Sequence, residues 1–324
     1  MKHLDLFSGY GGFALAAQSM GWETIGFSEI DKYASSVLRY NFRGIKNYGN
    51  VCEIDFKQFN GEVDIISGGT PCVDLSVAGK RKGLAGKRSG LFFEFIRAIT
   101  ESRPKYFLWE NVKGALSSNG GWDFARIQIE MEQAGYEVRW AVLNAKDYGV
   151  PQNRERVFIF GARGGCKSEI LRIAGSTDKT LKELTQGVSD ACRVYNPSGV
   201  GKSLKALGGG LGAKTGLYSV AVLAPDRVNK RQNGRRFKTD GEPNFTLTGQ
   251  DRHGVYDGIK IRRLTPLEAE RLMGLPDNWT KYGLDESGNR VEISDTQRYK
   301  MCGNGVVVPV IEYIYQNWIL SKTM

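Results

Sequence analysis

The chain has 324 residues, of which 41% are hydrophobic and 25% charged, as is typical of a globular protein with a sizeable core. A formal net charge of +10 predicts a polyanionic partner, although a merely basic surface would give the same count. Five scattered cysteines without a CxxC pair, and only two histidines, argue against a disulfide framework and a metal site such as zinc. Without a signal peptide or a bilayer-length apolar run, we expect a soluble cytoplasmic protein that binds no membrane.

The chain opens on a strand, a glycine-rich turn and a helix. Residues 3–7 (HLDLF) form the predicted strand, Ser8–Gly12 the turn and Phe13–Met20 the helix. A second strand, Thr24–Ser28, leads to Glu29, which lies 20 residues beyond the first glycine of the turn. At this offset a carboxylate accepts hydrogen bonds from ribose hydroxyls in nucleoside-binding βαβ units. Because the glycines read GxGG rather than GxGxxG, a plain tight turn remains the alternative.

A cysteine follows the next predicted strand. The apolar run Val63–Ile66 stops at a glycine pair that we expect to turn the chain, and Pro71 and Cys72 come next. Because ligands bind at the carboxyl ends of strands in open α/β sheets, this thiol is a candidate nucleophile, although a lone cysteine is usually a small buried hydrophobe. The loop after it, residues 73–90, is glycine-rich and basic. It is either a solvated loop or a lid that closes over a phosphate backbone.

Two further stretches place charged side chains near the same edge. Strand Tyr106–Trp109, after helix 90–102, ends on Glu110, although an acid in this position can also be a helix cap or a surface charge. Helix 122–134 precedes the strand pair Glu137–Asn144 and Val157–Gly161. Between these strands Gln152, Arg154 and Arg156 alternate, which places all three on one face if the strand begins there. A cationic face of this kind indicates anion or carbonyl binding.

The α/β alternation is lost after about residue 165. Between Arg193 and Arg263 there are 14 Lys or Arg residues against 5 Asp or Glu, which predicts a second, irregular, basic domain. RQNGRRF (231–237) and FTLTGQDRH (245–253) are rich in side chains that contact base edges and phosphates, although such residues are also common in turns. Thr265 then caps a predicted helix, and an apolar helix at Val306–Leu320 returns the chain to the first domain.

Taken together, these stretches resemble the DNA (cytosine-5)-methyltransferases of compact bacterial or phage type, over nearly the whole chain. Six motifs occur in the family's order: DLFSGYGGF (5–13), GGTPC (68–72), WENV (109–112), QNRER (152–156), RRLTPLEAERLMGLP (262–276) and GNGVV (303–307). The resemblance implies an α/β fold, with a doubly wound, Rossmann-like S-adenosylmethionine-dependent methyltransferase domain and a second, smaller, irregular target-recognition domain. We expect the catalytic, cofactor-binding domain at 1–185 and 300–324, the target-recognition domain at 186–280, and a connecting segment at 281–299.

The resemblance also implies roles for single residues. The catalytic set is Cys72 as nucleophile, Glu110 as proton partner of cytosine N3, Arg156 with Arg154 on the base O2, and Asn111 as a brace of the glutamate loop. The cofactor pocket is expected at Phe7, Gly9, Gly11, Gly12, Glu29, Ile30, Asn50, Val51, Pro71, Asn304 and Val306. DNA contacts are expected at Ser76, Lys80, Arg81, Lys82, Arg231, Arg235, Arg236, Thr246, Thr248, Gln250 and Arg252. Two departures, Asn50-Val51 for Asp-Ile and Val73-Asp74-Leu75 for Gln-x-Phe, predict weaker cofactor affinity and altered loop contacts.

The implied reaction moves a methyl group from S-adenosylmethionine to C5 of a cytosine flipped out of double-stranded DNA. Because C5 is a poor nucleophile, a thiolate must first add to C6, which gives a covalent Cys72–C6 adduct. We expect a monomer that acts alone or beside a separate restriction endonuclease, near the nucleoid. A tRNA cytosine-5 methyltransferase, a catalytically silent DNA-binding protein and a nicotinamide-dependent oxidoreductase are the alternatives, and the long basic region favours DNA over tRNA.

Overall fold

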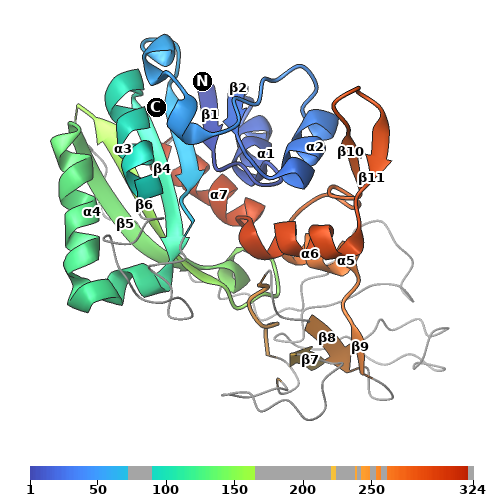
Figure 1. Cartoon of the computed structure of the whole chain (residues 1–324). Helices are drawn as coiled ribbons and strands as arrows, with labels where there is room; N and C mark the ends of the chain where they lie inside the picture. The colour runs from blue at the N-terminus through green and yellow to red at the C-terminus, as the bar shows by residue number, and fades with distance from the viewer. Residues whose placement is uncertain are drawn as a thin grey trace.

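The computed structural model describes residues 1–71, 90–164, 220–223, 238, 242–248, 253–256 and 261–319. The first part of the chain alternates strands and helices: β1 (Lys2–Leu6), α1 (Gly12–Ser19), β2 (Glu23–Ser28), α2 (Lys32–Asn41), β3 (Ile65–Gly69), α3 (Gly90–Ser102), β4 (Tyr106–Val112), α4 (Trp122–Gln133), β5 (Tyr136–Asn144) and β6 (Glu155–Arg163). Short 3-10 helices occur at Val51–Glu53, Phe56–Phe59, Lys113–Gly121 and Ala145–Tyr148. The elements expected in this part are confirmed (Figure 1).

The second part contains shorter elements: β7 (Val220–Leu223), β8 (His253–Tyr256), β9 (Ile261–Arg263), α5 (Pro266–Leu272), β10 (Tyr282–Leu284), β11 (Arg290–Glu292), α6 (Asp295–Asn304), α7 (Val308–Ile314) and a π-helix at Tyr315–Ile319. Thr265 caps α5 as expected, because its hydroxyl accepts from the N–H of Glu268 while the Glu268 carboxylate accepts from the N–H of Thr265. None of the described helices combines the length and apolarity needed to cross a membrane.

One mixed sheet organises the first part of the chain. Its order is β2-β1-β3-β4-β6-β5, with parallel pairing from β2 to β4 and antiparallel pairing of β6 with both β4 and β5. Leu6 pairs with Gly68, and Gly68 with Trp109, so β1, β3 and β4 end side by side. Val112 pairs with Arg156, which brings the start of β6 to the same edge. We call this the carboxyl edge of the sheet.

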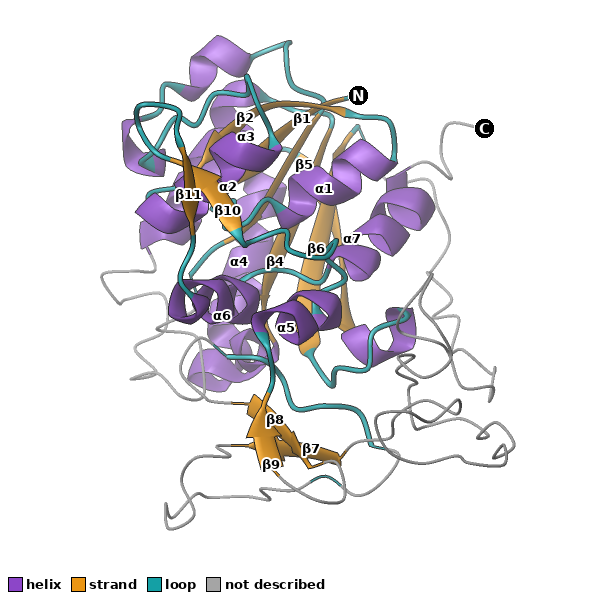
Figure 2. Cartoon of the chain, turned by 90° about the vertical axis from the view of Figure 1, so that its right-hand side faces the viewer, coloured by secondary structure: helices purple, strands orange, loops and turns teal. Residues whose placement is uncertain are grey.

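Alternating strand residues bury two layers of helices against the sheet. Ile65 and Leu108 point to a core shared with α1 and α7, which lie in front of the sheet in Figure 2. Ile66 and Phe107 point to a second core on the opposite face, which is shared with α3 and α4. Helices on both faces of a largely parallel sheet are the doubly wound α/β architecture that the sequence predicted.

The glycine pair before the Pro-Cys stretch corrects one expectation. We expected Gly68 and Gly69 to turn the chain, but both lie inside β3, and neither has a positive φ. A Cβ on Gly68 would lie 2.9 Å from the carbonyl oxygen of Leu6, and one on Gly69 would lie 2.8 Å from Oε2 of Glu110. These glycines are therefore needed for close approach to neighbouring strands. Glu110 likewise lies within β4, which runs on to Val112.

The structure describes only parts of the predicted target-recognition domain. Strands β7, β8 and β9 form a separate antiparallel sheet, drawn below α5 in Figure 1. The hairpin of β10 and β11 lies in the predicted connecting segment and contacts α2: Ser36 Oγ donates to the carbonyl oxygen of Leu284 at 2.8 Å. The second domain and all domain boundaries stay predictions.

Burial of His3 in β1 gives a pH dependence of stability. Burial lowers the pKa of His3 to about 3, whereas an unfolded chain holds a histidine near about 6.5. Below about pH 6.5 only the unfolded state binds this proton. The free energy of unfolding should therefore decrease as the pH is lowered, by up to about 1.4 kcal/mol per pH unit down to about pH 3. The free energy of unfolding can be measured with urea, from neutral pH to about pH 5, for the unaltered protein and for His3→Gln. It should fall more steeply for the unaltered protein as the pH is lowered. Parallel pH profiles would contradict this.

Candidate active site

The glycine-rich turn contacts Glu29, whose carboxylate is expected to bind a ribose. Phe7 and Gly9 both have φ of 55°, and Gly11 has φ of 83°. The N–H of Gly9 donates to Oε2 of Glu29 at 2.7 Å, and the N–H of Asp31 donates to Oε1 at 2.7 Å. Burial raises the pKa of Glu29, and the two backbone donors oppose that rise. A Cβ on Gly9 would meet no heavy atom of the described residues within 4 Å, so there is open space beside Gly9.

The residues expected around an adenine lie beside this turn. Ile30 follows Glu29 directly and is 77% exposed, which suits a flat apolar ligand. Asn50 caps a 3-10 helix: its Oδ1 accepts from the N–H of Cys52 at 3.2 Å, and Val51 is buried. The Asn50 oxygen keeps a second lone pair for a ligand donor, because an amide oxygen accepts two hydrogen bonds.

Arginine and tyrosine side chains bind the loop between α6 and α7. Asn304, the last residue of α6, is exposed, and Val306 in the loop is buried. The hydroxyl of Tyr10, in the glycine-rich turn, donates to the carbonyl oxygen of Val306. The Arg154 guanidinium donates to the carbonyl oxygen of Gly305 at 2.7 Å. Sequence reasoning missed the role of Tyr10 because its partner lies 296 positions away.

Asn111 connects β4 to the segment that leads into Cys72. It is fully buried, and its Nδ2 donates to the carbonyl oxygen of Thr70 at 3.3 Å and to Thr70 Oγ1 at 3.2 Å. Trp109 Nε1 donates to the same hydroxyl at 3.1 Å. The Oδ1 of Asn111 also accepts from the N–H of Val112 at 2.8 Å, in the strand that carries Glu110. Its amide therefore contacts this strand and the residue before Pro71, and its expected role as a brace stays a prediction. Sequence reasoning also missed the contacts of Thr70, because its partners Trp109 and Asn111 lie 39 and 41 positions away.

An ion pair joins β4 and β6 at the carboxyl edge. Arg156 Nε lies 3.1 Å from Oε1 of Glu110, and both side chains are mostly buried. Burial raises the pKa of Glu110, while the positive charges of Arg156 and Arg154 oppose that rise. A carboxyl group in this environment is better able to retain a proton than an exposed glutamate.

Gln152 and Arg154 contact backbone from three distant segments. Arg154 donates to the carbonyl oxygen of Leu247 at 2.9 Å as well as to the α6–α7 loop. Gln152 donates to the carbonyl oxygen of Leu272 at 2.8 Å and accepts from the N–H of Leu247 at 3.0 Å. Both side chains are buried, but they precede β6, which begins at Glu155, so the condition for one strand face shared with Arg156 is not met. Their contacts position backbone, and the expected contact of Arg154 with a base stays a prediction.

The remaining predicted residues fall into two groups. Thr246 Oγ1 donates to the carbonyl oxygen of Asn153 at 2.5 Å, and the N–H of Thr248 donates to Nε2 of His253 at 3.4 Å. The others lie outside the described residues: Cys72, Ser76, Lys80, Arg81, Lys82, Arg231, Arg235, Arg236, Gln250 and Arg252. Most of the predicted lid, 73–90, lies there too. Their roles stay predictions.

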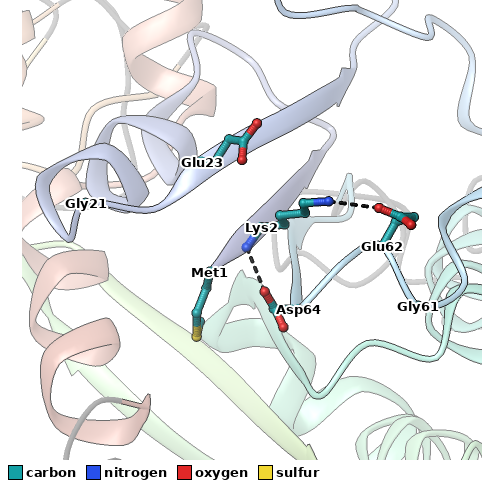
Figure 3. A pocket seen from close by; sticks show the side chains of 7 residues that line it. All are labelled: Met1, Lys2, Gly21, Glu23, Gly61, Glu62 and Asp64. Carbon is teal, nitrogen blue, oxygen red and sulfur yellow. Dashed lines mark hydrogen bonds and ion pairs between the residues drawn. The ribbon is translucent and has the colours of Figure 1, made fainter.

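A shallow hollow of about 410 Å³ lies at the opposite edge of the sheet (Figure 3). It is lined by Met1, Lys2, Gly21, Glu23, Gly61, Glu62 and Asp64. Lys2 Nζ lies 2.8 Å from Oε2 of Glu62, and the N–H of Lys2 donates to Oδ2 of Asp64 at 2.8 Å. No predicted site residue borders this hollow, and we assign it no function.

Residues 1–319 match the family model of the C-5 cytosine-specific DNA methylases. The chain belongs to this family. It is 31% identical to the orphan methyltransferase M.SPRI of Bacillus phage SPR, with 98% of this chain and 97% of the relative covered. It is also 31% identical to the type II methyltransferase M.HhaI of Haemophilus parahaemolyticus, covering 98% and 94%.

Solved structures of methyltransferases share the fold of this DNA methylase family member. The S. pombe Dnmt2 methyltransferase matches with a TM-score of 0.66 at 17% identity, covering 100% of both chains. A putative DNA modification methyltransferase encoded within a prophage of E. coli matches with a TM-score of 0.64 at 22% identity, covering 99% of both chains. At these identities the likeness concerns the fold alone.

Removal of the Asn111 amide should impair methylation. In Asn111→Ala, the carbonyl of Thr70 loses its buried donor, which should lower the free energy of unfolding by about 1–3 kcal/mol. Positional freedom at Thr70 and Pro71 should also slow DNA methylation. Asn317→Ala is the control, because its exposed amide donates to the carbonyl oxygen of Tyr313 at 2.8 Å, outside the candidate site. Equal methylation rates in the two folded variants, measured by mass spectrometry of nucleosides, would contradict the role of Asn111.

Proposed function

We propose that this protein transfers a methyl group from S-adenosylmethionine to C5 of a cytosine in duplex DNA, through a covalent adduct between Cys72 and C6. The ion pair of Glu110 and Arg156 carries this proposal. It lies at the carboxyl edge of the sheet, where β3 leads into Pro71 and β1 leads into the glycine-rich turn. The methyl donor and the reacting base would therefore meet at one edge.

The residues around the glycine-rich turn fit S-adenosylmethionine. The Glu29 carboxylate, fixed by two backbone donors, can accept hydrogen bonds from ribose hydroxyls, and the exposed side chain of Ile30 can pack on the adenine. The open space at Gly9 leaves room for the bound molecule. When bound, this cofactor supplies an electrophilic methyl group on a sulfonium. Asn304 and Val306 would line the other side of the pocket.

Three side chains would act on the cytosine. The Cys72 thiolate forms a bond to C6, and C5 then has the enamine character needed to accept a methyl group. Negative charge develops on the ring, and Glu110 neutralises it by donating or sharing a proton at N3; burial, which raises its pKa, favours this. Arg156 would bind the base O2 with guanidinium N–H groups that are not paired with Glu110. A base then takes the C5 proton, the bond between C6 and sulfur breaks, and Cys72 leaves as the thiolate, which restores the aromatic ring.

DNA binding would depend on the basic part of the chain. The cytosine must leave the stacked duplex to reach Glu110, which costs a few kcal/mol. A net charge of +10 favours a phosphate backbone, with affinity that falls as salt rises. Relatives carry names of both orphan and type II methyltransferases, so we propose an enzyme that methylates on its own, whether or not a restriction endonuclease accompanies it.

Nucleoside mass spectrometry tests this function. Unmethylated duplex DNA incubated with the protein and S-adenosylmethionine should gain 5-methylcytosine. Cys72→Ala should give none, and Glu110→Gln should slow the reaction by about 10²- to 10⁴-fold, the range for a lost proton-transfer group. Cys52→Ser, which changes an exposed thiol, is the control.

A parallel reaction with tRNA distinguishes the main alternative. Methylation of tRNA but not of DNA would overturn the proposed substrate. DNA binding without methylation of either nucleic acid would overturn the enzymatic function and favour a DNA-binding protein.

A further inference from the structure

Tyr10 lies in the glycine-rich turn, yet its side chain is almost fully buried. Its hydroxyl donates to the carbonyl oxygen of Val306, in the loop between α6 and α7. This carbonyl precedes α7, whose N-cap is Val307. The bond therefore joins the two ends of the described chain at the predicted cofactor pocket.

Missing side chains at two glycines make room for the Tyr10 ring. A Cβ on Gly305 would lie 2.2 Å from Cε1 of Tyr10, and a Cβ on Gly12 would lie 3.0 Å from Cε2. Real Cβ atoms do not approach other heavy atoms as closely as 2.2 Å, so Gly305 and Tyr10 are sterically matched. Burial also raises the pKa of Tyr10 well above its usual value, so the hydroxyl remains a donor at neutral pH.

The backbone of Tyr10 is fixed from another direction. Trp279 Nε1 donates to the carbonyl oxygen of Tyr10 at 3.0 Å. The indole also packs edge-on against Phe42, with ring centroids 5.6 Å apart, and Phe42 occupies the space beside Gly11. The α6–α7 loop is in turn bound by Arg154 through the Gly305 carbonyl. The hydroxyl of Tyr10 joins these two fixed structures by a hydrogen bond, beside the close approach of Gly12 to Val306.

We propose that Tyr10 is a positioning residue that sets the separation of the two walls of the cofactor pocket, which are the turn at 8–12 and the segment 303–306 at the end of α6 and the start of the α6–α7 loop. This inference rests on the proposed function, because those segments are expected to bind S-adenosylmethionine. Tyr10 is the chain neighbour of Gly9 in the first wall, and its hydroxyl binds the Val306 carbonyl in the second wall. Loss of its hydroxyl removes one of the contacts that fix the loop and leaves those of Arg154, so we expect weaker cofactor binding and a folded protein.

Calorimetric titration with S-adenosylmethionine tests the hydroxyl. Tyr10→Phe should weaken cofactor binding by about tenfold, the usual scale for a lost buried hydrogen bond. The KM for S-adenosylmethionine should rise in parallel, with kcat at saturation and DNA affinity without cofactor changed less than about twofold. Tyr136→Phe is the matched control: Tyr136 is also buried, and its hydroxyl donates to the carbonyl oxygens of Ile99 and Pro104. A purely structural role would affect both variants alike.

A double-mutant cycle tests the match between ring and glycine. Gly305→Ala should weaken cofactor binding, because the new methyl group collides with the Tyr10 ring. In a Tyr10→Ala background the same change should cost much less, since the collision is removed. Equal effects of Gly305→Ala in both backgrounds, in variants that circular dichroism shows to be folded, would contradict the proposal.

The outcomes separate this inference from the proposed function. If the unaltered protein binds no S-adenosylmethionine, the proposed function fails. If it binds the cofactor and Tyr10→Phe binds with the affinity of Tyr136→Phe, only the role of Tyr10 is overturned.

Discussion

The parallel register of β1, β3 and β4 is the constraint on which the candidate site depends. Leu6, Gly68 and Trp109 lie in line across the sheet, so the elements that follow them meet at one edge. Antiparallel β6 then brings Arg156 opposite Val112, within 3.1 Å of the Glu110 carboxylate. A slip of one residue would turn Glu110 to the other face of the sheet and separate it from Arg156.

Close packing around this edge relies on glycines at contact points. Gly69 leaves room for the Glu110 carboxylate, and Gly305 leaves room for the Tyr10 ring. Buried polar side chains then join segments that the sheet does not connect: Asn111 reaches Thr70, and Arg154 reaches Leu247 and Gly305. The site is therefore built from one sheet edge and a small set of long-range hydrogen bonds.

Features governed by local sequence could be predicted. Apolar runs predicted the strands of the sheet, and the Thr265 capping box predicted the start of α5. The offset from the glycine turn indicated Glu29, which does contact Gly9, while its contact with a ribose stays a prediction. Tertiary pairings could not be predicted, because no local pattern marks them. Examples are the glycine pair inside β3 and the buried ion pair of Glu270 and Arg298, whose Oε1 and Nη2 lie 3.0 Å apart. Cys72 and most of the predicted DNA-contacting residues lie outside the described residues.

The central claim, that Cys72 attacks the cytosine at this edge, can be tested by trapping the adduct. Duplex DNA with 5-fluorocytosine at the target position lacks the C5 proton whose loss releases the enzyme, so the bond to C6 should persist after methylation. Peptide mass spectrometry of the denatured complex should find the modified base on Cys72. Attachment at exposed Cys52, or at buried Cys302, would contradict the account. So would turnover of this DNA without any covalent product.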